Sequence, residues 1–320
     1  MRTTLGAVAV VLLAVSLAAV LGARGPGPAE AEAAPWTFAQ SMSQRRSYVA
    51  AALAGGEIYA AGGMVGETGR FLDVFQRYDP QTDTWTTLDR LPEPVRAGAG
   101  AALDGKIYVI GGQVQEGSGR QVFAYDVAAR RWQERAPLPE PRFNVAAVAL
   151  GGKVYALGGF GGEREHSDVF VYDPASDSWS AGTRLPRANH TFGAVVFRGE
   201  IWVLGGRRGE NILREVWIYD PRTRRWRAGP TMPRAMELVG AAVVGDQIHA
   251  IWEDVYQIYD ASTGRWTQGP RSLVTRHGLK TFYADGALYT VGGCTTDLHD
   301  SQVVEMRSLG GAAAAGSEMR

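Results

Sequence analysis

The chain has 320 residues, a formal net charge of zero and a single cysteine. One cysteine excludes an intrachain disulfide scaffold and a paired-cysteine zinc site, and the balanced charge argues against the basic surface that nucleic-acid binding needs. Glycine is abundant, with 41 residues where ~7% of a chain is usual, and it accompanies nine tryptophans and twelve tyrosines. This composition favours an all-β fold of short strands and tight turns.

The first predicted element is a targeting segment. Arg2 precedes the charge-free run Thr3–Ala23, whose core at residues 5–23 is rich in Ala, Val and Leu. The core reaches the ~18 residues at which a membrane helix becomes possible, and A-x-A patterns typical of signal cleavage follow within Ala29–Ala33. We therefore expect residues 1–34 to be a cleaved signal peptide, or an uncleaved anchor with a short linker. Both alternatives place the rest of the chain in the extracellular space or the periplasm.

The body of the chain repeats with a period near 47 residues, which is typical of stacked or radial repeats. A Trp follows the Tyr of a Tyr-Asp pair by seven residues in five copies, whose pairs begin at Tyr78, Tyr125, Tyr172, Tyr219 and Tyr259. Gly-Gly pairs end short apolar runs at Gly62, Gly111, Gly158, Gly205 and Gly292. Three landmarks in a fixed order predict one structural unit per copy.

Each copy predicts four antiparallel strands, the first of which is short and made of small residues, as in Ala194–Phe197. Trp36 marks a fourth strand with nothing before it, and about Gly278–Met306 supplies three strands with no fourth strand after them. The N-terminal strand is therefore expected to complete the C-terminal copy. This closure predicts a six-bladed β-propeller over residues 35–308, because a closed ring leaves no open hydrophobic face. We expect residues 309–320 to form a flexible tail.

The fifth copy spans 40 residues where the earlier copies span 47. Ile248–Trp252 and Val255–Tyr259 predict its second and third strands, which leaves only Glu253-Asp254 to connect them as a two-residue hairpin loop. The short loop is expected to notch the rim beside the tall loops of blade four. We expect a ligand to reach the axis through this notch, past Glu237.

The order of landmarks resembles the kelch repeat, with an Arg, a small strand, a Gly turn, Gly-Gly, Tyr-Asp and Trp. The stretch from Arg187 through Trp226 is a near-complete match, and the resemblance covers about Pro35 to Arg307. It implies a six-bladed kelch β-propeller with four antiparallel strands per blade. It implies little about activity, because kelch propellers host many unrelated functions.

Strand direction places the long, charged loops between strands two and three on the same face as the connections between blades. Variable polar loops on a rigid scaffold usually carry binding, so this face is the predicted binding face. Each connection between blades carries an arginine before strand one: Arg46, Arg96, Arg142, Arg187, Arg234 and Arg276. Because guanidinium groups bind carboxylates, the six arginines predict a ring that suits an anionic ligand. The alternative is that they bind nearby backbone or carboxylate groups within the fold.

One step further along these connections, His190, Glu237 and His277 align in blades four, five and six. Two His and a carboxylate near an axis have the chemistry for a metal site or for acid–base work. The favoured alternative is that they contact a neighbouring blade, and we expect no metal and no cofactor. His166, in a long loop, is expected to be solvated, and Cys294 is expected to be buried.

We favour a non-catalytic binding module over an enzyme. The expected ligand is a protein or a glycan, and the arginines favour an anionic one. The expected state is a monomer that contacts membranes only through an uncleaved N-terminus. The alternative is a carbohydrate-active enzyme resembling secreted sialic-acid mutarotases, which are similar in size, export and blade count. A galactose-oxidase-like copper enzyme is less favoured, since that family's Cys–Tyr link, second Tyr and two His accompany, as a rule, a seven-bladed propeller.

Overall fold

The computed structural model describes residues 35–115, 117–295 and 299–309. The chain divides into two units, Met1–Ala33 and Ala34–Arg320. The predicted signal or anchor segment lies outside the described residues, as does the predicted tail beyond Leu309. Within the described residues there is no helix with the length and apolar character needed to cross a bilayer.

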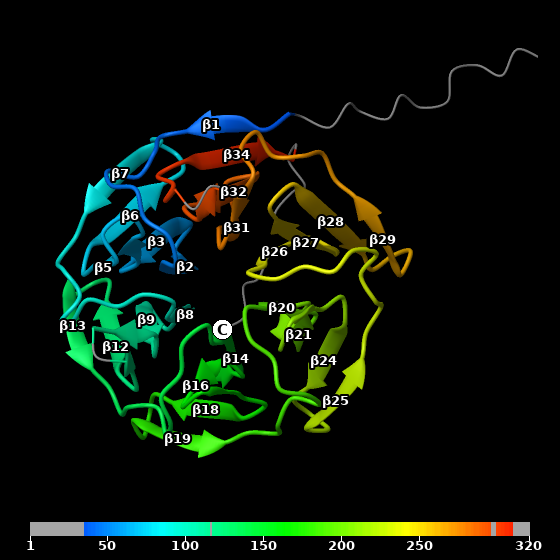
Figure 1. Ribbon diagram of the computed structural model, residues 1–320, viewed down its shortest axis with the longest axis horizontal. Helices are drawn as coiled ribbons and strands as arrows, with labels where there is room; N and C mark the ends of the chain where they lie inside the picture. Colours follow the sequence, from blue (N-terminus) through cyan, green and yellow to red (C-terminus); the bar gives the residue numbers. More distant parts are fainter. Residues whose placement is uncertain (1–34, 116, 296–298, 310–320) are drawn as a thin grey trace, which may run out of the picture. The chain divides into compact units, whose positions relative to one another are not determined.

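Six four-stranded antiparallel sheets form a ring in the described part of the second unit (Figure 1). Blade one consists of β2 (Ala50–Ala54), β3 (Glu57–Ala61), β6 (Phe75–Asp79) and β7 (Thr84–Thr87), and blade two of β8 (Ala99–Leu103), β9 (Lys106–Ile110), β12 (Val122–Asp126) and β13 (Arg131–Glu134). Blade three consists of β14 (Ala146–Leu150), β15 (Lys153–Leu157), β18 (Val169–Asp173) and β19 (Ser178–Ala181), and blade four of β20 (Gly193–Phe197), β21 (Glu200–Leu204), β24 (Val216–Asp220) and β25 (Arg225–Ala228). Blade five consists of β26 (Gly240–Val244), β27 (Gln247–Trp252), β28 (Val255–Asp260) and β29 (Arg265–Gln268), and blade six of β31 (Lys280–Ala284), β32 (Ala287–Val291), β34 (Val304–Ser308) and β1 (Thr37–Ala39).

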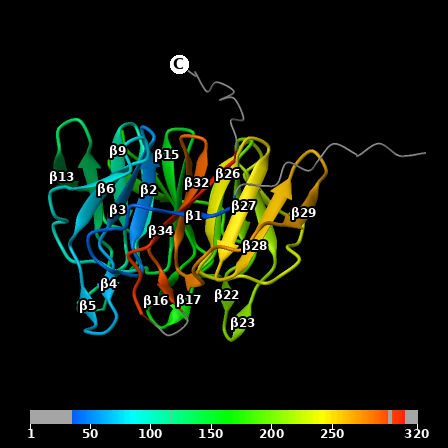
Figure 2. The same ribbon diagram turned by 90° about the horizontal axis from the view of Figure 1, so that it is seen from above.

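Two-residue strands extend the sheets on one face of the ring. Ribbons join strands two and three of the first four blades: β4 (Met64–Val65) with β5 (Arg70–Phe71), β10 (Gln113–Val114) with β11 (Gly117–Ser118), β16 (Phe160–Gly161) with β17 (Arg164–Glu165), and β22 (Arg207–Arg208) with β23 (Asn211–Ile212). In blade six, β30 (Arg276–His277) pairs with β33 (Cys294–Thr295). Figure 2 shows β4, β5, β16, β17, β22 and β23 together at the lower side of the ring. We call this side the loop face.

The N-terminal strand closes the ring, as predicted. Strand β1 pairs with β34 in antiparallel register, with Thr37 opposite Met306 and Ala39 opposite Val304. Trp36 is only 3% exposed. Its indole N–H donates a hydrogen bond to the Pro270 carbonyl at 3.1 Å. Blade six is therefore assembled from both ends of the described chain.

The repeated tryptophans join each blade to the one before it. Every fourth-strand Trp donates its indole N–H to a backbone carbonyl just beyond the fourth strand of the preceding blade, at 2.7–3.1 Å. Within most blades the ring of this Trp also packs on the Tyr of the Tyr-Asp pair, as Tyr78 does on Trp85 at 5.1 Å between centroids. The landmarks of the repeat therefore make the contacts that hold the ring together.

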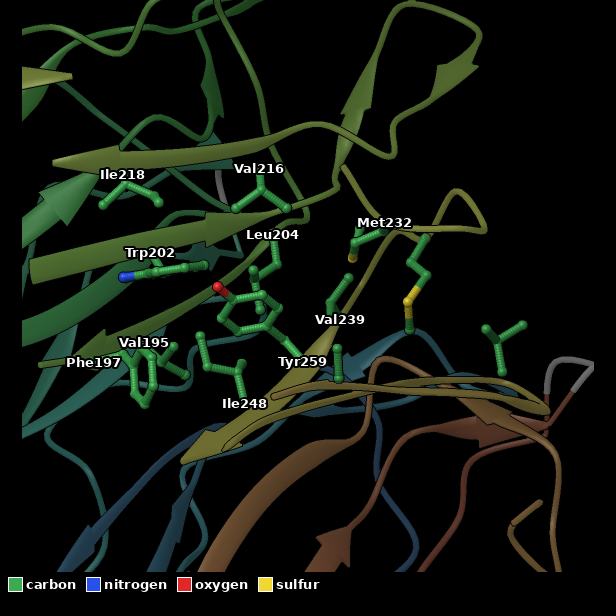
Figure 3. Packing of buried hydrophobic residues seen from close by; sticks show 13 residues of the cluster. Val195, Phe197, Trp202, Leu204, Val216, Ile218, Met232, Val239, Ile248 and Tyr259 are labelled. Carbon is green, nitrogen blue, oxygen red and sulfur yellow. The ribbon is translucent and has the colours of Figure 1, made fainter. Parts of the chain in front are cut away.

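The core consists of apolar clusters between neighbouring blades. Between blades four and five, Phe197, Trp202 and Ile248 pack around Tyr259 (Figure 3), and the rings of Trp202 and Tyr259 lie 5.1 Å apart. The Gly-Gly pairs let the chains approach at the loop face. Gly62 has a φ of +64°, and a Cβ there would lie 2.3 Å from the Val95 carbonyl oxygen of the next connection.

One polar group is buried between blades five and six. His249 is 2% exposed, and its Nδ1 lies 2.5 Å from the hydroxyl oxygen of Tyr256. The guanidinium of Arg307 lies over the Tyr256 ring at 5.8 Å. Burial, and secondarily the positive charge of Arg307, lowers the pKa of His249 to about 4. His249 is therefore neutral in the folded protein at neutral pH.

Acidification is expected to destabilise the fold through His249. The unfolded chain takes up a proton near pH 6.5, whereas the folded protein does so only near pH 4, so stability falls as pH falls across this interval. The full loss is about 3 kcal/mol, reached near pH 4. Urea unfolding of the parent and of His249→Gln at pH 7 and pH 4.5 should show a weaker pH dependence in the variant. The exposed His299→Gln serves as the control, and parallel behaviour of both variants and the parent would contradict the assignment.

Candidate functional site

A cavity of about 330 Å³ opens on the loop face at the axis, over blades four to six. We call it the mouth pocket, and its wall includes Tyr48, His190, Arg207, Glu237, Trp252 and His277. The structure therefore brings together His190, Glu237 and His277, the three residues that the sequence aligned. The pocket lies at the short blade: Trp252 pairs with Val255, which confirms that Glu253-Asp254 is a two-residue hairpin loop.

A ring of backbone in an unusual conformation adjoins the mouth pocket. Two positions before the first residue of each inner strand, φ is positive and lies between 47° and 70°: Tyr48, Ala97, Asn144, Thr191, Leu238 and Gly278. The N–H groups of Ala97 and Asn144 each donate to the carbonyl of the preceding member at 2.8 Å. Positive φ is uncommon for residues with a side chain, and such strain gathers at functional sites. These residues surround a constriction of about 40 Å³, which we call the throat.

Glu237 and Arg207 form a bidentate pair across the pocket. Arg207 donates from Nε and Nη2 to the two carboxylate oxygens at 2.6 and 2.7 Å. This hydrogen bonding raises the pKa of Arg207. The pair presents little net charge to the pocket, and it fixes both side chains in one orientation.

Two polar atoms of the pocket wall have no partner. His190 Nδ1 and Trp252 Nε1 are buried and make no hydrogen bond to any residue that the structure describes. His190 Nε2 lies 3.5 Å from a Glu165 oxygen, and burial lowers the pKa of His190 although Glu165 opposes the shift. Buried polar atoms in native proteins are nearly always bonded, so these two are groups that a ligand or water would satisfy.

The imidazole of His277 contacts the single cysteine of the chain. Its Nε2 lies 2.8 Å from Cys294 Sγ, and Cys294 is buried. Burial raises the pKa of the Cys294 thiol to about 11. The sulfur is therefore a protonated thiol at neutral pH, which orients the imidazole and is a poor nucleophile.

The six arginines divide into two groups of different exposure. Arg46, Arg142 and Arg276 are at most 1% exposed. Arg46 donates to the carbonyls of Gly62 and Val74, and Arg276 makes the equivalent bonds in blade six. Arg142 donates instead to the Pro141 carbonyl and to the carboxylate of Glu140. The structure therefore corrects the predicted ring, because these three guanidinium groups are buried and have partners within the fold.

The side chains of the other three arginines are partly or fully exposed on the loop face. Arg96 is partly buried over the rings of Tyr48 and Phe71, at 5.8 and 5.0 Å. Arg187 is exposed, with Glu215 at 3.8 Å. Arg234 is also exposed. An anionic ligand would therefore meet Arg96, Arg187 and Arg234 and not a ring of six.

Glu140, His166 and Asp168 are the only group in the described residues whose ligand atoms lie close enough to hold a metal ion, within 4.8 Å. Arg142 already lies 3.0 Å from Glu140 and 3.5 Å from Asp168. His166 is 2% exposed, with Nε2 bonded to the Gly161 carbonyl, which corrects the expected solvation. The loop folds back on itself and buries the imidazole.

The comparisons with known proteins agree with this fold. The sequence profile described as the KLHDC2/KLHL20/DRC7 Kelch-repeats domain matches residues 48–251. The chain belongs to the kelch-repeat family. Similar kelch proteins include Kelch-like protein 35 of Homo sapiens, 38% identical over 82 residues, and the F-box/kelch-repeat protein SKIP11 of Arabidopsis thaliana, 35% identical over 77 residues.

These similarities cover 26% and 24% of this kelch chain and only 14% and 16% of the two relatives. The chain therefore matches a small part of their length. A solved structure titled "Structure of YjhT" superimposes with a TM-score of 0.73 over 83% of this chain and 95% of that chain, at 14% identity. At this identity the likeness concerns the kelch propeller fold alone.

Proposed function

We propose that this protein is a secreted or membrane-anchored binding module that takes a protein or glycan ligand on its loop face. A kelch β-propeller suggests a protein-binding module. The observation that carries the site is the pair of buried, unpartnered atoms in the mouth pocket, His190 Nδ1 and Trp252 Nε1. Export is supported by the charge-free run Thr3–Ala23 and the A-x-A patterns after it.

The charge of the loop face favours an anionic ligand. The side chains of Arg187 and Arg234 are exposed there, and that of Arg96 is partly exposed. Their guanidinium groups have no close hydrogen-bonded carboxylate among the described residues, since the Arg187–Glu215 distance is 3.8 Å. Exposed guanidinium groups bind carboxylates well, and they lie on the same face as a pocket that gathers several polar side chains.

A binding screen of the mature protein against a glycan panel that includes sialylated glycans tests this proposal. Protein variants are then measured against any glycan that binds. Trp252→Phe removes one hydrogen-bond donor and keeps the ring, and Arg234→Ala removes one exposed cation. Each is expected to weaken binding about tenfold, or about 1.4 kcal/mol. Arg225→Ala, on the opposite face, is the matched control. Equal losses from all three variants, or none from the first two, would overturn the assignment.

A carbohydrate-active enzyme is the second candidate. It is favoured by the proton-transfer groups that share the mouth pocket, His190 and His277 with the carboxylates of Glu237 and Glu253. Sialic acid added to the same sample, with its two anomers followed by NMR, separates the alternatives. Accelerated interconversion supports the enzyme, and binding without it supports the module.

A further inference from the structure

The chain contains three lysines, and one of them stands apart. Lys106 and Lys153 begin the equivalent strands β9 and β15 and pair with Asp126 and Asp173, at 3.7 and 2.5 Å. The side-chain amine of Lys280 makes no hydrogen bond or ion pair with any residue that the structure describes. It is also half-buried, so solvent does not fully replace the missing partner.

Lys280 also breaks the pattern of the repeat. It is the first residue of β31, the inner strand of blade six. The inner strands of the other blades begin with a residue that has no side chain beyond Cβ: Ala50, Ala99, Ala146, Gly193 and Gly240. Small residues suit the crowded axis, where the inner strands gather in Figure 1. A residue that breaks a local rule without a structural gain points to function.

Three connected cavities follow the axis, and Lys280 lies where two of them meet. The central channel, about 580 Å³, is lined by the inner strands, and Lys280 lines both this channel and the throat. Tyr48, Asn144 and Thr191 line both the throat and the mouth pocket. A group that passes from the mouth pocket into the throat therefore meets the part of the wall to which Lys280 belongs.

Among the described residues, no carboxylate lines the channel or the throat. The ionisable side chains in these two walls are Tyr48, Tyr283 and Lys280. Burial alone lowers the pKa of Lys280. Burying an ammonium without a partner is unfavourable, and a bound anion would supply the missing charge. The throat therefore combines an unpaired cation with an environment free of competing negative groups.

We propose that Lys280 binds the carboxylate of a small-molecule ligand whose body lies in the mouth pocket. The throat, about 40 Å³, has room for about three waters, which matches the three heavy atoms of a carboxylate. Trp252, whose buried Nε1 has no partner among the described residues, lines the mouth pocket in which the body of the ligand would lie. The part of the proposal that involves the mouth pocket rests on the proposed function, whereas the anion site at Lys280 is tested separately.

Acetate tests the throat alone. Reductive methylation with ¹³C-formaldehyde gives each lysine an NMR signal, which Lys→Arg variants assign. We expect the pKa of Lys280 to lie below the ordinary value for a lysine, and acetate at constant ionic strength to raise it. Lys106 and Lys153 are internal controls, whose signals should not respond to acetate. A Lys280 signal that ignores acetate would overturn the proposal, as would a larger response to phosphate.

Glucuronate tests the mouth pocket together with the throat. Lys280→Met is expected to weaken glucuronate binding at least tenfold by calorimetry, and Lys106→Met to leave it unchanged. Lys280→Met should melt no lower than the parent, because it removes a half-buried charge that has no partner among the described residues. Trp252→Phe should weaken glucuronate binding but leave the acetate response of Lys280 intact. An acetate response without glucuronate binding would support the Lys280 site and count against the mouth pocket.

Discussion

Replacing Trp36 by alanine is expected to lower the free energy of unfolding by roughly 3–5 kcal/mol. The indole is 3% exposed and packs edge-on against Tyr256, with ring centroids 5.9 Å apart. Its N–H bond to Pro270 also joins blade six to blade five. The substitution therefore removes buried apolar surface and loosens the seam at which the ring closes. Chemical denaturation followed by far-UV circular dichroism measures the loss.

Phe38→Ala is the matched control for this prediction. Phe38 lies two residues further along the same N-terminal segment, in β1, and is 63% exposed. Its truncation leaves the pairing of β1 with β34 intact and should change stability by about 0.5 kcal/mol or less. Deleting Pro35–Gln40 should cost at least as much as Trp36→Ala, because it also exposes the edge of β34. A truncated protein that melts like the parent would exclude closure by this strand.

Replacing Arg276 by methionine is expected to cost about 3–5 kcal/mol, because it leaves Glu305 buried without its cation. Both side chains are fully buried, and Arg276 Nη2 lies 2.5 Å from a Glu305 oxygen. Glu305 also accepts hydrogen bonds from the backbone N–H groups of Leu273 and Val274. The pair thus anchors the connection between blades five and six. Urea unfolding of the variant measures the cost.

The double variant Arg276→Met/Glu305→Leu should recover part of this loss, since it removes both charges together. Recovery should be incomplete, because Arg276 also satisfies the carbonyls of Gly292 and Val303. Arg225→Met, at an exposed position in β25, is the control and should be nearly neutral. A loss below about 1 kcal/mol for Arg276→Met would show that the guanidinium is not needed inside blade six.

The sequence predicted the fold well because its landmarks are the contacts of the ring. The Trp at each fourth strand makes the bond between blades, and the spacing between Trp36 and the C-terminal copy identified the closing strand. The two-residue loop at Glu253-Asp254 also followed from counting residues. These predictions depend on the lengths of the repeats and on the order of their landmarks, and both can be read directly from the sequence.

The site was predicted only in part, because spacing does not say which way a side chain points. Six arginines at equivalent positions look alike in the sequence, yet the guanidinium of Arg276 satisfies carbonyls inside its blade and that of Arg234 meets solvent. The sequence predicted that Trp252 ends the second strand of the fifth copy, but it carried no sign of the unpartnered indole N–H. Lys280 becomes conspicuous only when the inner strands are aligned by their first residues.

The pairing of β1 with β34 also sets an order of events during synthesis. Thr37 and Met306 are 269 residues apart, so at common translation rates about 15–50 s pass between the appearance of the two strands. The intervening blades consist of consecutive strands and can form as they emerge. Blade six cannot, because its outer strand is made first and its inner strands last. A nascent chain therefore carries β1 without its partner until β34 has been synthesised, and the pairing of β1 with β34 closes the ring only after the strands of the other five blades have been made.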